Sequence, residues 1–276
     1  MSVSSSSLPP SAIVSRLRAA GCVFAEDEAE LLISAARTPA GLAAMVDRRV
    51  AGLPLEHVLG WAEFRGLRIA VDPGVFVPRR RTEFLVGRAA ALARPGAVVV
   101  DLCCGSGALG AALVTAVGRA DLYATDIDPA AVLCARRNVA AVGGEVYEGD
   151  LYDPLPAALR GRVDVLLANV PYVPTEEMAL LPPEAREHEA RVALDGGTDG
   201  LDVLRRVTAQ AAVWLAPGGH LLFETSRRQA AAAVRTVTRD GLVPQVATSD
   251  ELDATVVVAT RPVLRDAPAG QDGSRT

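Results

Sequence analysis

The stretch AVVVDLCCGSGALG, residues 97–110, decides the fold class of this chain. Its first part is a continuous apolar run, which is typical of a strand buried on both faces of a parallel sheet. A turn that contains Gly105 and Gly107 follows, and the apolar spacing after the turn predicts a helix. A buried strand that enters a glycine-containing turn and then a helix indicates an α/β sheet with a ligand site at the turn.

Short apolar runs and helical segments continue to alternate after this stretch. Strands are predicted at residues 121–126, 145–150, 163–168, 219–225, 242–247 and 254–259. Helices are predicted at residues 108–117, 129–142, 199–215 and 227–239, with a long loop before the third of them. Strands that alternate with helices imply parallel pairing, so the predicted fold class is α/β with a Rossmann-like sheet.

A small helical unit precedes the α/β domain. Helical spacing of apolar residues predicts helices at residues 11–20, 26–36 and 39–51 in this unit, and a fourth helix at 82–92 within the α/β domain. Between the third and fourth of these, apolar and polar residues alternate around glycine and proline, as in a hairpin. The predicted units are a disordered leader at residues 1–10, a helical N-terminal domain at 11–51, a hairpin linker at 52–78, the α/β domain at 79–265 and a disordered tail at 266–276.

The composition of the 276 residues, 50% hydrophobic and 22% charged, suits a globular protein with one full core and a smaller appendage. No segment is long and apolar enough to span a membrane, and the N-terminus lacks the basic start of a secretory signal. The spacing of four cysteines and three histidines fits neither a metal site nor a disulfide framework. The net charge of −5 argues against direct nucleic-acid binding. We therefore expect a cytoplasmic protein without a metal ion.

Small or acidic residues follow the predicted strands at the edge where ligands bind in folds of this kind. Asp126 ends the second strand, about 20 residues after the glycine turn, where an acid can accept both hydroxyls of a ribose. A nicotinamide site is one interpretation, but the G-x-G-x-x-G pattern matches only from Gly105 onward. S-adenosylmethionine fits better because it has no pyrophosphate, with Asp150 suited to the adenine amino group and Asp101 to the methionine ammonium. The residues in question are Asp101, Gly105, Ser106, Gly107, Asp126, Asp150 and Asn169.

The apolar run at residues 163–168 ends in the tetrapeptide NVPY, residues 169–172. Pro171 cannot continue the ladder of a sheet and holds Val170 extended. A turn of this kind directs the Asn169 amide and a backbone carbonyl into the cleft above the strand. A plain exit from strand to loop is the alternative interpretation, since Asn and Pro are common turn residues.

Seven segments occur in an order that resembles the HemK/PrmC family of protein N5-glutamine methyltransferases. They are VFVPRRRTEFLV (75–86), DLCCGSGALG (101–110), ATDIDPAAVLCARRN (124–138), EGDLYDPLP (148–156), NVPY (169–172), ALDGGTDGLDVLRRV (193–207) and GGHLLFET (218–225). The resemblance covers residues 52–260 and implies a class I methyltransferase fold, with a mostly parallel sheet and an antiparallel last strand. It also implies S-adenosyl-L-methionine as the cofactor. The implied substrate is a protein, the glutamine of the Gly-Gly-Gln motif in a peptide-chain release factor, or a ribosomal protein.

The resemblance implies roles for individual residues. The Asn169 amide oxygen and the Val170 carbonyl would accept the two N–H hydrogens of the substrate amide, which holds its nitrogen in line with the methyl group. Pro171 belongs to the same catalytic turn, and Tyr172 would pack on the planar substrate group. The implied cofactor residues are Asp101, Gly105, Ser106, Gly107, Asp126, Ile127, Asp150, Leu151 and Asn169, and the implied substrate residues are Arg79, Glu83 and Tyr172.

The sequence departs from the family pattern in three places. Val170 replaces the first proline of an Asn-Pro-Pro-Tyr motif, and Cys103 stands where the family usually has glycine. Arg80 and Arg81 replace a proline and an acid near the expected substrate entrance. Two alternatives therefore stay open: a diverged N-methyltransferase that acts on another planar nitrogen, in a nucleobase or small molecule, and a protein that binds the cofactor without turnover.

Overall fold

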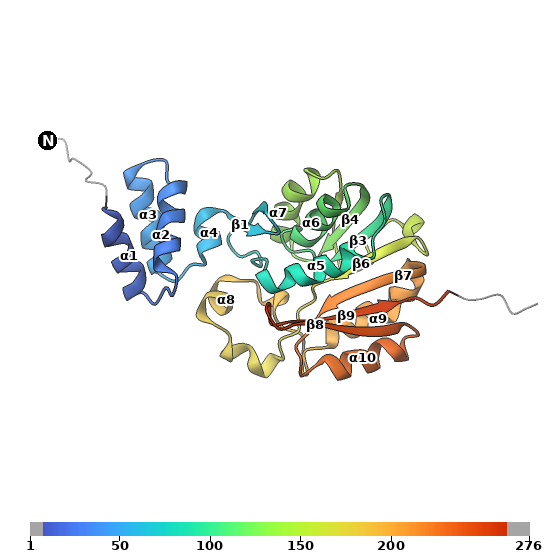
Figure 1. The fold of residues 1–276 in the computed structure, drawn as a ribbon. Coiled ribbons are helices and arrows are strands. Elements are labelled where there is room, and N and C mark those ends of the chain that lie inside the picture. Colours follow the sequence, from blue (N-terminus) through green and yellow to red (C-terminus); the bar gives the residue numbers. More distant parts are fainter. Residues whose placement is uncertain (1–7, 264–276) are drawn as a thin grey trace, which may run out of the picture.

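The computed structural model describes residues 8–263. The predicted tail at residues 266–276 and the first seven residues of the predicted leader lie outside the described residues. Figure 1 shows a group of N-terminal helices on one side of the molecule and the α/β sheet on the other, with a small hairpin between them.

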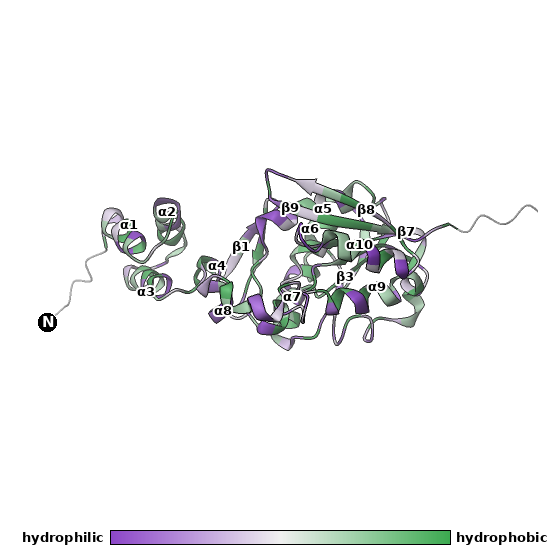
Figure 2. Ribbon diagram, turned by 90° about the horizontal axis from the view of Figure 1, so that it is seen from below, coloured by the Kyte–Doolittle hydropathy of each residue, from purple (hydrophilic) through white to green (hydrophobic). Residues whose placement is uncertain are grey.

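Three N-terminal helices confirm the helical spacing read from the sequence. They are α1 (Pro10–Ala19), α2 (Ala25–Ala35) and α3 (Pro39–Val50). Figure 2 shows hydrophilic and hydrophobic residues side by side around these helices, as expected for helices with one buried face. Ile13, Leu17, Leu32 and Val46 are fully buried in a core of their own, separate from the core of the sheet. The boundaries assigned to the domains stay predictions.

The linker region holds one more element than the sequence indicated. The predicted hairpin is present as β1 (Trp61–Phe64) and β2 (Leu67–Ala70), paired antiparallel. Its turn residues, Arg65 and Gly66, both have positive φ, as a tight two-residue hairpin turn requires. A short helix, α4 (Leu55–Leu59), precedes it and was not predicted. Five residues are too few to show a helical period, which is why the sequence pattern does not reveal this helix.

The part of the chain that the structure describes forms a central sheet of seven strands in the order β5-β4-β3-β6-β7-β9-β8. Adjacent strands from β5 to β7 pair in parallel, whereas β9, the last strand within residues 8–263, is antiparallel to both of its neighbours. This arrangement confirms the predicted fold class. The strands are β3 (Ala97–Leu102), β4 (Ala120–Asp126), β5 (Glu145–Glu148), β6 (Val163–Ala168), β7 (Leu215–Glu224), β8 (Val243–Ser249) and β9 (Ala254–Thr260).

Helices cover both faces of this sheet (Figure 1). Val99 and Leu167 belong to the core shared with α5, α6 and α7, whereas their neighbours Val100 and Leu166 belong to the core shared with α9 and α10. Because successive residues face opposite covered faces, the strands read as unbroken apolar runs. The helices are α5 (Glu83–Ala90), α6 (Ala108–Val117), α7 (Pro129–Ala140), α9 (Asp202–Trp214) and α10 (Ala230–Arg239).

Some element boundaries differ from those predicted. Helix α9 begins at Asp202 rather than at residue 199, because Gly200 has φ 76° and the Asp199 side chain accepts a hydrogen bond from the Leu201 N–H instead. Strand β7 begins at Leu215, whereas the predicted strand began at residue 219. The prediction began late because the sequence APGG at residues 216–219 interrupts the apolar pattern of the strand. The predicted long loop before α9 contains the 3-10 turns Thr175–Leu180 and Arg191–Ala193 and the short helix α8 (Pro183–His188).

Candidate functional site

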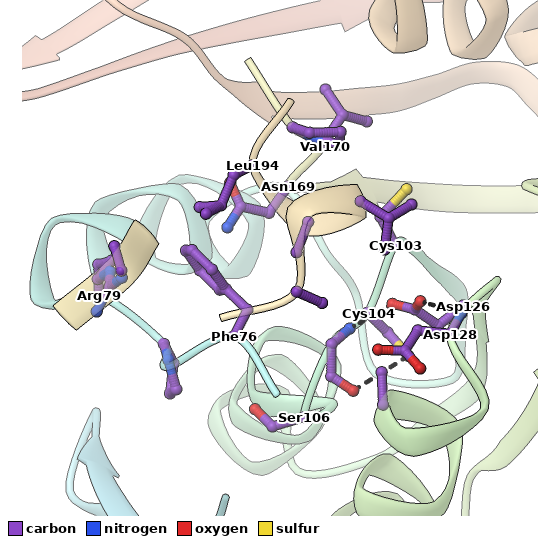
Figure 3. A pocket seen from close by; sticks show the side chains of 18 of the residues that line it. Phe76, Arg79, Cys103, Cys104, Ser106, Asp126, Asp128, Asn169, Val170 and Leu194 are labelled. Carbon is purple, nitrogen blue, oxygen red and sulfur yellow. Dashed lines mark hydrogen bonds between the residues drawn. The ribbon is translucent and has the colours of Figure 1, made fainter. Parts of the chain in front are cut away.

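A cavity of about 320 Å³ opens where the parallel strands β3, β4 and β6 end. Figure 3 shows Ser106, Asp126 and Asp128 at one end of this cavity and Phe76, Asn169 and Leu194 at the other. The cavity wall includes most of the residues predicted for the site, namely Arg79, Gly105, Ser106, Asp126, Ile127, Asn169, Val170, Pro171 and Tyr172. Residues separated by more than 60 positions in the chain therefore meet here, as the parallel sheet requires.

The turn after β3 keeps its shape through residues in the left-handed region of φ. Gly107 has φ 76°, and a Cβ at this position would lie 2.7 Å from the Val139 side chain. Cys103, which stands where the family pattern has glycine, has φ 53°. A side chain in this region of φ costs roughly 1–2 kcal/mol, so the family preference for glycine at position 103 has a backbone cause. The Cys103 side chain lies in the cavity wall.

Asp126, at the end of β4, is held by the turns on either side of it. One carboxylate oxygen accepts the Gly105 N–H at 2.8 Å, and the other accepts the Asp128 N–H at 2.9 Å. Burial raises the pKa of this carboxyl, and the backbone N–H groups of Asp128 and Gly105 oppose the shift. Two oxygens offer about four acceptor positions, so Asp126 retains capacity for the hydroxyl groups of a ligand.

Asp101 lies beneath the glycine turn and is 1% exposed. One of its oxygens accepts the Gly110 N–H at 2.9 Å, and the other is buried with no hydrogen-bond partner among the described residues. Burial raises the pKa of Asp101 to about 7. A buried acceptor without a donor is unfavourable, so a cationic or N–H-bearing ligand group above the turn would fit this oxygen.

Other residues predicted for the site lie outside the cavity wall, and their roles stay predictions. Asp150 forms an ion pair with Arg206 at 2.5 Å. Glu83 accepts the Arg65 N–H at 3.1 Å, on the side of the hairpin. Leu151 is 5% exposed and belongs to the core. The predicted residues outside the wall are Glu83, Asp101, Gly107, Asp150 and Leu151.

Asn169 directly follows β6 and presents an unused acceptor. Its Oδ1 atom is buried without a hydrogen-bond partner in the described part of the chain. Figure 3 shows the Asn169 side chain in the cavity between Phe76 and Leu194. Leaving such an oxygen unpaired costs about 1–3 kcal/mol, which a donor on a bound ligand would recover. The neighbouring Val170 directs its side chain into the core and is 2% exposed.

The Tyr172 hydroxyl is fixed by Arg81, noted in the sequence only as a departure from the family pattern, and by Glu224, which the sequence did not single out. It donates to Glu224 Oε1 at 2.8 Å and accepts from the Arg81 guanidinium at 2.6 Å. Arg81 also donates from Nε to Glu224 at 2.8 Å. Burial raises the pKa of Tyr172, so the hydroxyl is protonated at neutral pH. The sequence signal for Glu224 was its place at the end of the apolar run of β7, the same kind of position that identified Asp126.

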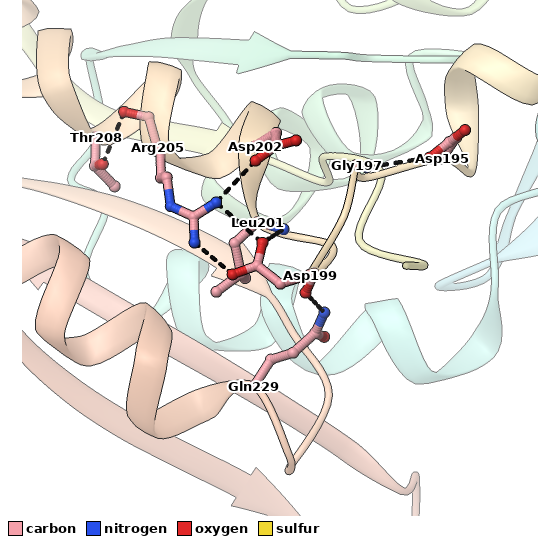
Figure 4. Close-up of polar contacts among 8 residues, drawn as sticks. All are labelled: Asp195, Gly197, Asp199, Leu201, Asp202, Arg205, Thr208 and Gln229. Atoms are coloured by element: carbon pink, nitrogen blue, oxygen red, sulfur yellow. Dashed lines mark hydrogen bonds and ion pairs between the residues drawn. The ribbon is translucent and has the colours of Figure 1, made fainter. Parts of the chain in front are cut away.

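The segment at residues 195–200 packs closely against the backbone of the NVPY turn. A Cβ at Gly196 would lie 2.7 Å from the Pro171 carbonyl oxygen, and one at Gly200 would lie 2.3 Å from the Tyr172 carbonyl oxygen. Figure 4 shows how Asp199 holds this segment through Arg205, which bonds both of its carboxylate oxygens, and through Gln229. Glycines are therefore required here by close backbone contact with the turn.

Arg79, predicted to contact substrate, has a partner within the chain. Its guanidinium donates to both oxygens of Glu189 at 2.7 and 2.6 Å, and Glu189 also accepts the Val77 N–H at 3.0 Å. The Glu189 side chain is 1% exposed, and burial raises its pKa while Arg79 opposes the shift. The guanidinium also lies 4.8 Å from the Phe76 ring. Nothing in the sequence pattern indicated Glu189, because it lies 110 residues away in the predicted long loop.

Within residues 8–263 no group of histidine, cysteine and acidic side chains is arranged to hold a metal ion. None of the helices described there has both the length and the apolar character needed to cross a membrane.

This chain is similar to known methyltransferases in sequence and in fold. A family model described as Methyltransferase small domain matches residues 66–184. The chain is 40% identical over 230 residues to a release factor glutamine methyltransferase of Mycolicibacterium smegmatis, covering 81% of each chain. It is 38% identical over 193 residues to a 4-amino-L-phenylalanine/4-methylamino-L-phenylalanine methyltransferase of Streptomyces pristinaespiralis, covering 67% of this chain and 65% of the other. A solved methyltransferase of Pyrococcus furiosus shares the fold, with a TM-score of 0.55 and 17% identity over 80% of this chain and 98% of its own.

Proposed function

This chain belongs to the release factor glutamine methyltransferase family, and we propose that it methylates the side-chain amide nitrogen of a glutamine in a peptide-chain release factor. The observation that carries the proposal is the buried Oδ1 atom of Asn169 in the wall of the cavity, which has no partner among the described residues. An acceptor in this position fits an N–H-bearing planar group, which a glutamine side chain supplies.

The proposed chemistry follows from the weakness of an amide as a nucleophile. The lone pair of an amide nitrogen is delocalised into its carbonyl. Catalysis must therefore come mainly from the position of the nitrogen and from electrostatic stabilisation of the transition state. Asn169 Oδ1 and the Val170 carbonyl oxygen would accept the two hydrogens of the substrate NH₂ group. These fixed acceptors orient the nitrogen and stabilise the positive charge that develops on it during transfer. Among the described residues no histidine lines the cavity, so the proposal assigns no general base, and the methylated nitrogen loses its extra proton to water after transfer.

S-adenosyl-L-methionine is the cofactor, and it supplies a methyl group activated by a positively charged sulfonium. The residues present fit it at the end of the cavity away from Asn169. Asp126 would accept the ribose hydroxyls, and the unpaired oxygen of Asp101 would attract the methionine ammonium from beneath the turn. Gly105 and Ser106 would allow the ligand to approach the backbone closely. Ile127, Asp150 and Leu151 are proposed as the surroundings of the adenine.

The proposed partner is therefore a protein, and the proposed place of action is the cytoplasm, where translation terminates. Arg79, Glu83 and Tyr172 are proposed to contact the substrate. Direct nucleic-acid binding does not form part of the proposal, given the net charge of −5.

A small-molecule amine is the second candidate substrate, and two observations favour it. The relative from Streptomyces pristinaespiralis is named for methylation of an aromatic amine on an amino acid. Val170 also departs from the family tetrapeptide at the residue whose carbonyl would hold the substrate nitrogen. An aryl amine attached to a planar ring offers the same pair of N–H donors to Asn169 and Val170.

The test supplies both substrates to the purified protein. The protein is incubated with labelled S-adenosylmethionine and either an unmethylated release factor or 4-amino-L-phenylalanine. We expect one methyl group on the Gly-Gly-Gln glutamine, located by mass spectrometry of the digested release factor. The matched control is Asn169→Ala, which should bind cofactor without transferring label. Label on the amino acid with none on release factor would overturn the proposal in favour of the second candidate.

A further inference from the structure

We propose that Arg81 is a positioning residue for methyl transfer, which acts by fixing the ring of Tyr172 in the cavity wall. The inference rests on the proposed function, since it is the Tyr172 ring that would pack on the planar substrate amide. Arg81 belongs to neither the proposed cofactor residues nor the proposed substrate residues. It acts through a closed set of contacts, the Arg81–Glu224–Tyr172 cluster.

Each carboxylate and hydroxyl oxygen in this cluster has a hydrogen-bond partner. Glu224 is 3% exposed at the end of β7, and its Oε1 atom accepts both the Tyr172 hydroxyl and Arg81 Nε at 2.8 Å. Its Oε2 atom accepts the Thr82 hydroxyl at 2.7 Å. Arg81 closes the set by donating from Nη2 to the Tyr172 oxygen at 2.6 Å. The Tyr172 hydroxyl is therefore held by two hydrogen bonds, one to Glu224 on β7 and one from Arg81.

The two contacts at position 81 suit an arginine. A planar guanidinium presents several donors in a fixed fork, so one side chain can reach two acceptors at once. Its charge also compensates the buried Glu224 carboxylate, which would otherwise be costly. Position 81 is one of the three departures from the family pattern, where an acid is expected. An acid here would face Glu224 with like charge, so this chain fixes its tyrosine by a contact of its own.

In the described structure, neither neighbouring arginine, Arg79 or Arg80, bonds to the cluster through its side chain. The Arg79 guanidinium forms an ion pair with Glu189. Arg80 is exposed, and its side chain forms no hydrogen bond or ion pair with the residues described in the structure. Arg80→Gln therefore removes the same charge from the same turn without touching the cluster, which makes it the matched control.

The experiment compares Arg81→Gln, Arg80→Gln, Tyr172→Phe and the double variant Arg81→Gln/Tyr172→Phe. We measure kcat and KM for release factor and the Kd for S-adenosylmethionine. Arg81→Gln is expected to lower kcat about tenfold, because a small misplacement of reacting groups is costly. Cofactor affinity should stay within about twofold, and Arg80→Gln should leave all three constants within about twofold. In the Tyr172→Phe background the Arg81 change should add little, because its effect passes through the missing hydroxyl.

A second readout needs no substrate. With isotope-labelled tyrosine, the chain gives signals from only four rings, and Tyr172→Phe identifies the one of interest. The Tyr172 ring should give signals of a fixed ring in the wild type and of a mobile ring in Arg81→Gln. Arg81→Lys retains the charge but not the fork, so it should fall between the two, and it serves as the second variant if Arg81→Gln does not fold.

The outcomes separate the two proposals. A wild type that leaves release factor unmethylated refutes the proposed function, while the ring signals still decide whether Arg81 positions Tyr172. Unchanged ring signals in Arg81→Gln refute the positioning role. So does a kcat equal to that of Arg80→Gln, or an effect of Arg81→Gln that multiplies with that of Tyr172→Phe.

Discussion

The side-chain amide of Gln229 donates a hydrogen bond to the carbonyl oxygen of Tyr172 at 2.9 Å. The same amide nitrogen donates to the Asp199 carbonyl at 3.0 Å. One side chain just before α10 thus joins the NVPY turn to the glycine-rich segment behind it. The backbone of the turn is therefore held by a side chain that is not part of the cavity wall.

Gly200→Ala is expected to disrupt the contact between this glycine-rich segment and the NVPY turn. The new Cβ would lie 2.3 Å from both the Tyr172 carbonyl oxygen and Gln229 Nε2, in a backbone with φ 76°. We expect a loss of more than ~2 kcal/mol in the free energy of unfolding, from close contact and strain together. Chemical denaturation measures it, and methyl transfer should fall in parallel.

The control for this change is Gly143→Ala. Gly143 has nearly the same φ, 75°, but a Cβ there meets no atom within 4 Å. It should cost only the strain of the left-handed backbone, roughly 1–2 kcal/mol, and leave transfer unaffected in the folded protein. Equal losses in the two variants would show that contact with the NVPY turn is not what requires glycine at position 200.

Asp126→Ala is expected to weaken cofactor binding. Hydrogen bonds from ribose hydroxyls to a carboxylate are worth about 1.5–3 kcal/mol, so the Kd for S-adenosylmethionine should rise at least about tenfold. Calorimetry on the folded variant measures it. Asp121→Ala changes an exposed acid on the same strand and should leave the Kd unchanged. An unaltered Kd in Asp126→Ala would remove Asp126 from the cofactor site.

Asn169→Ala should separate binding from chemistry. Loss of one positioned polar group costs a factor of about 10²–10³ in kcat, whereas the cofactor end of the cavity is left intact. Because the Asn169 oxygen is buried and unpaired in the described structure, the variant should be no less stable than the wild type. Single-turnover kinetics and thermal unfolding provide the two measurements. A large drop in stability would make Asn169 a structural turn residue.

The raised pKa of Asp101 determines how this residue makes the stability of the free protein depend on pH. Its pKa of about 7 lies above the value of about 3.9 for an unfolded chain, so the folded protein binds the proton more tightly. Stability from this group is therefore present at low pH and is lost as pH rises from about 4 to about 7, at about 1.4 kcal/mol per unit. Asp101→Asn should lack this decline in denaturation experiments at pH 5 and 7.

The same carboxyl predicts the opposite trend for cofactor binding. Only the ionised form attracts the methionine ammonium, so affinity for S-adenosylmethionine should rise as pH increases through about 7. Asp101→Asn should bind more weakly above this pH and show little dependence across it. Asp126 also has a raised pKa but is present in both proteins, so the comparison isolates Asp101. Parallel pH profiles in the two proteins would refute the assignment.

The sequence predicted those parts of the site that depend on periodicity. Apolar runs located the strands, and parallel pairing brings their carboxyl ends together, so Asp126 and Asn169 could be placed beside one cavity. Partners such as Glu189 for Arg79 could not be predicted, because they come from loops more than 100 residues away and carry no periodic signal. The short helices α4 and α8 were missed for a similar reason, since each is under two turns long.

Val170→Pro tests which substrate this chain serves. The proposed acceptor is the Val170 carbonyl, which proline keeps. Proline also needs a backbone N–H that is not in use, and within residues 8–263 the Val170 N–H donates no hydrogen bond. The variant should therefore bind S-adenosylmethionine as the wild type does and retain most of its activity on release factor. Activity is measured side by side on release factor and on 4-amino-L-phenylalanine.

Val170→Ala is the control that separates the turn from the packing. The Val170 side chain is 2% exposed in the core shared with Leu201 and Phe223, so its truncation should cost about 2 kcal/mol of stability without rigidifying the turn. If valine instead shapes the pocket for an aryl amine, Val170→Pro should lose activity on the amino acid and gain it on release factor. Two results together would assign the chain to the small-molecule reaction. The wild type would be inactive on release factor, and Val170→Pro would lose activity on 4-amino-L-phenylalanine while gaining it on release factor.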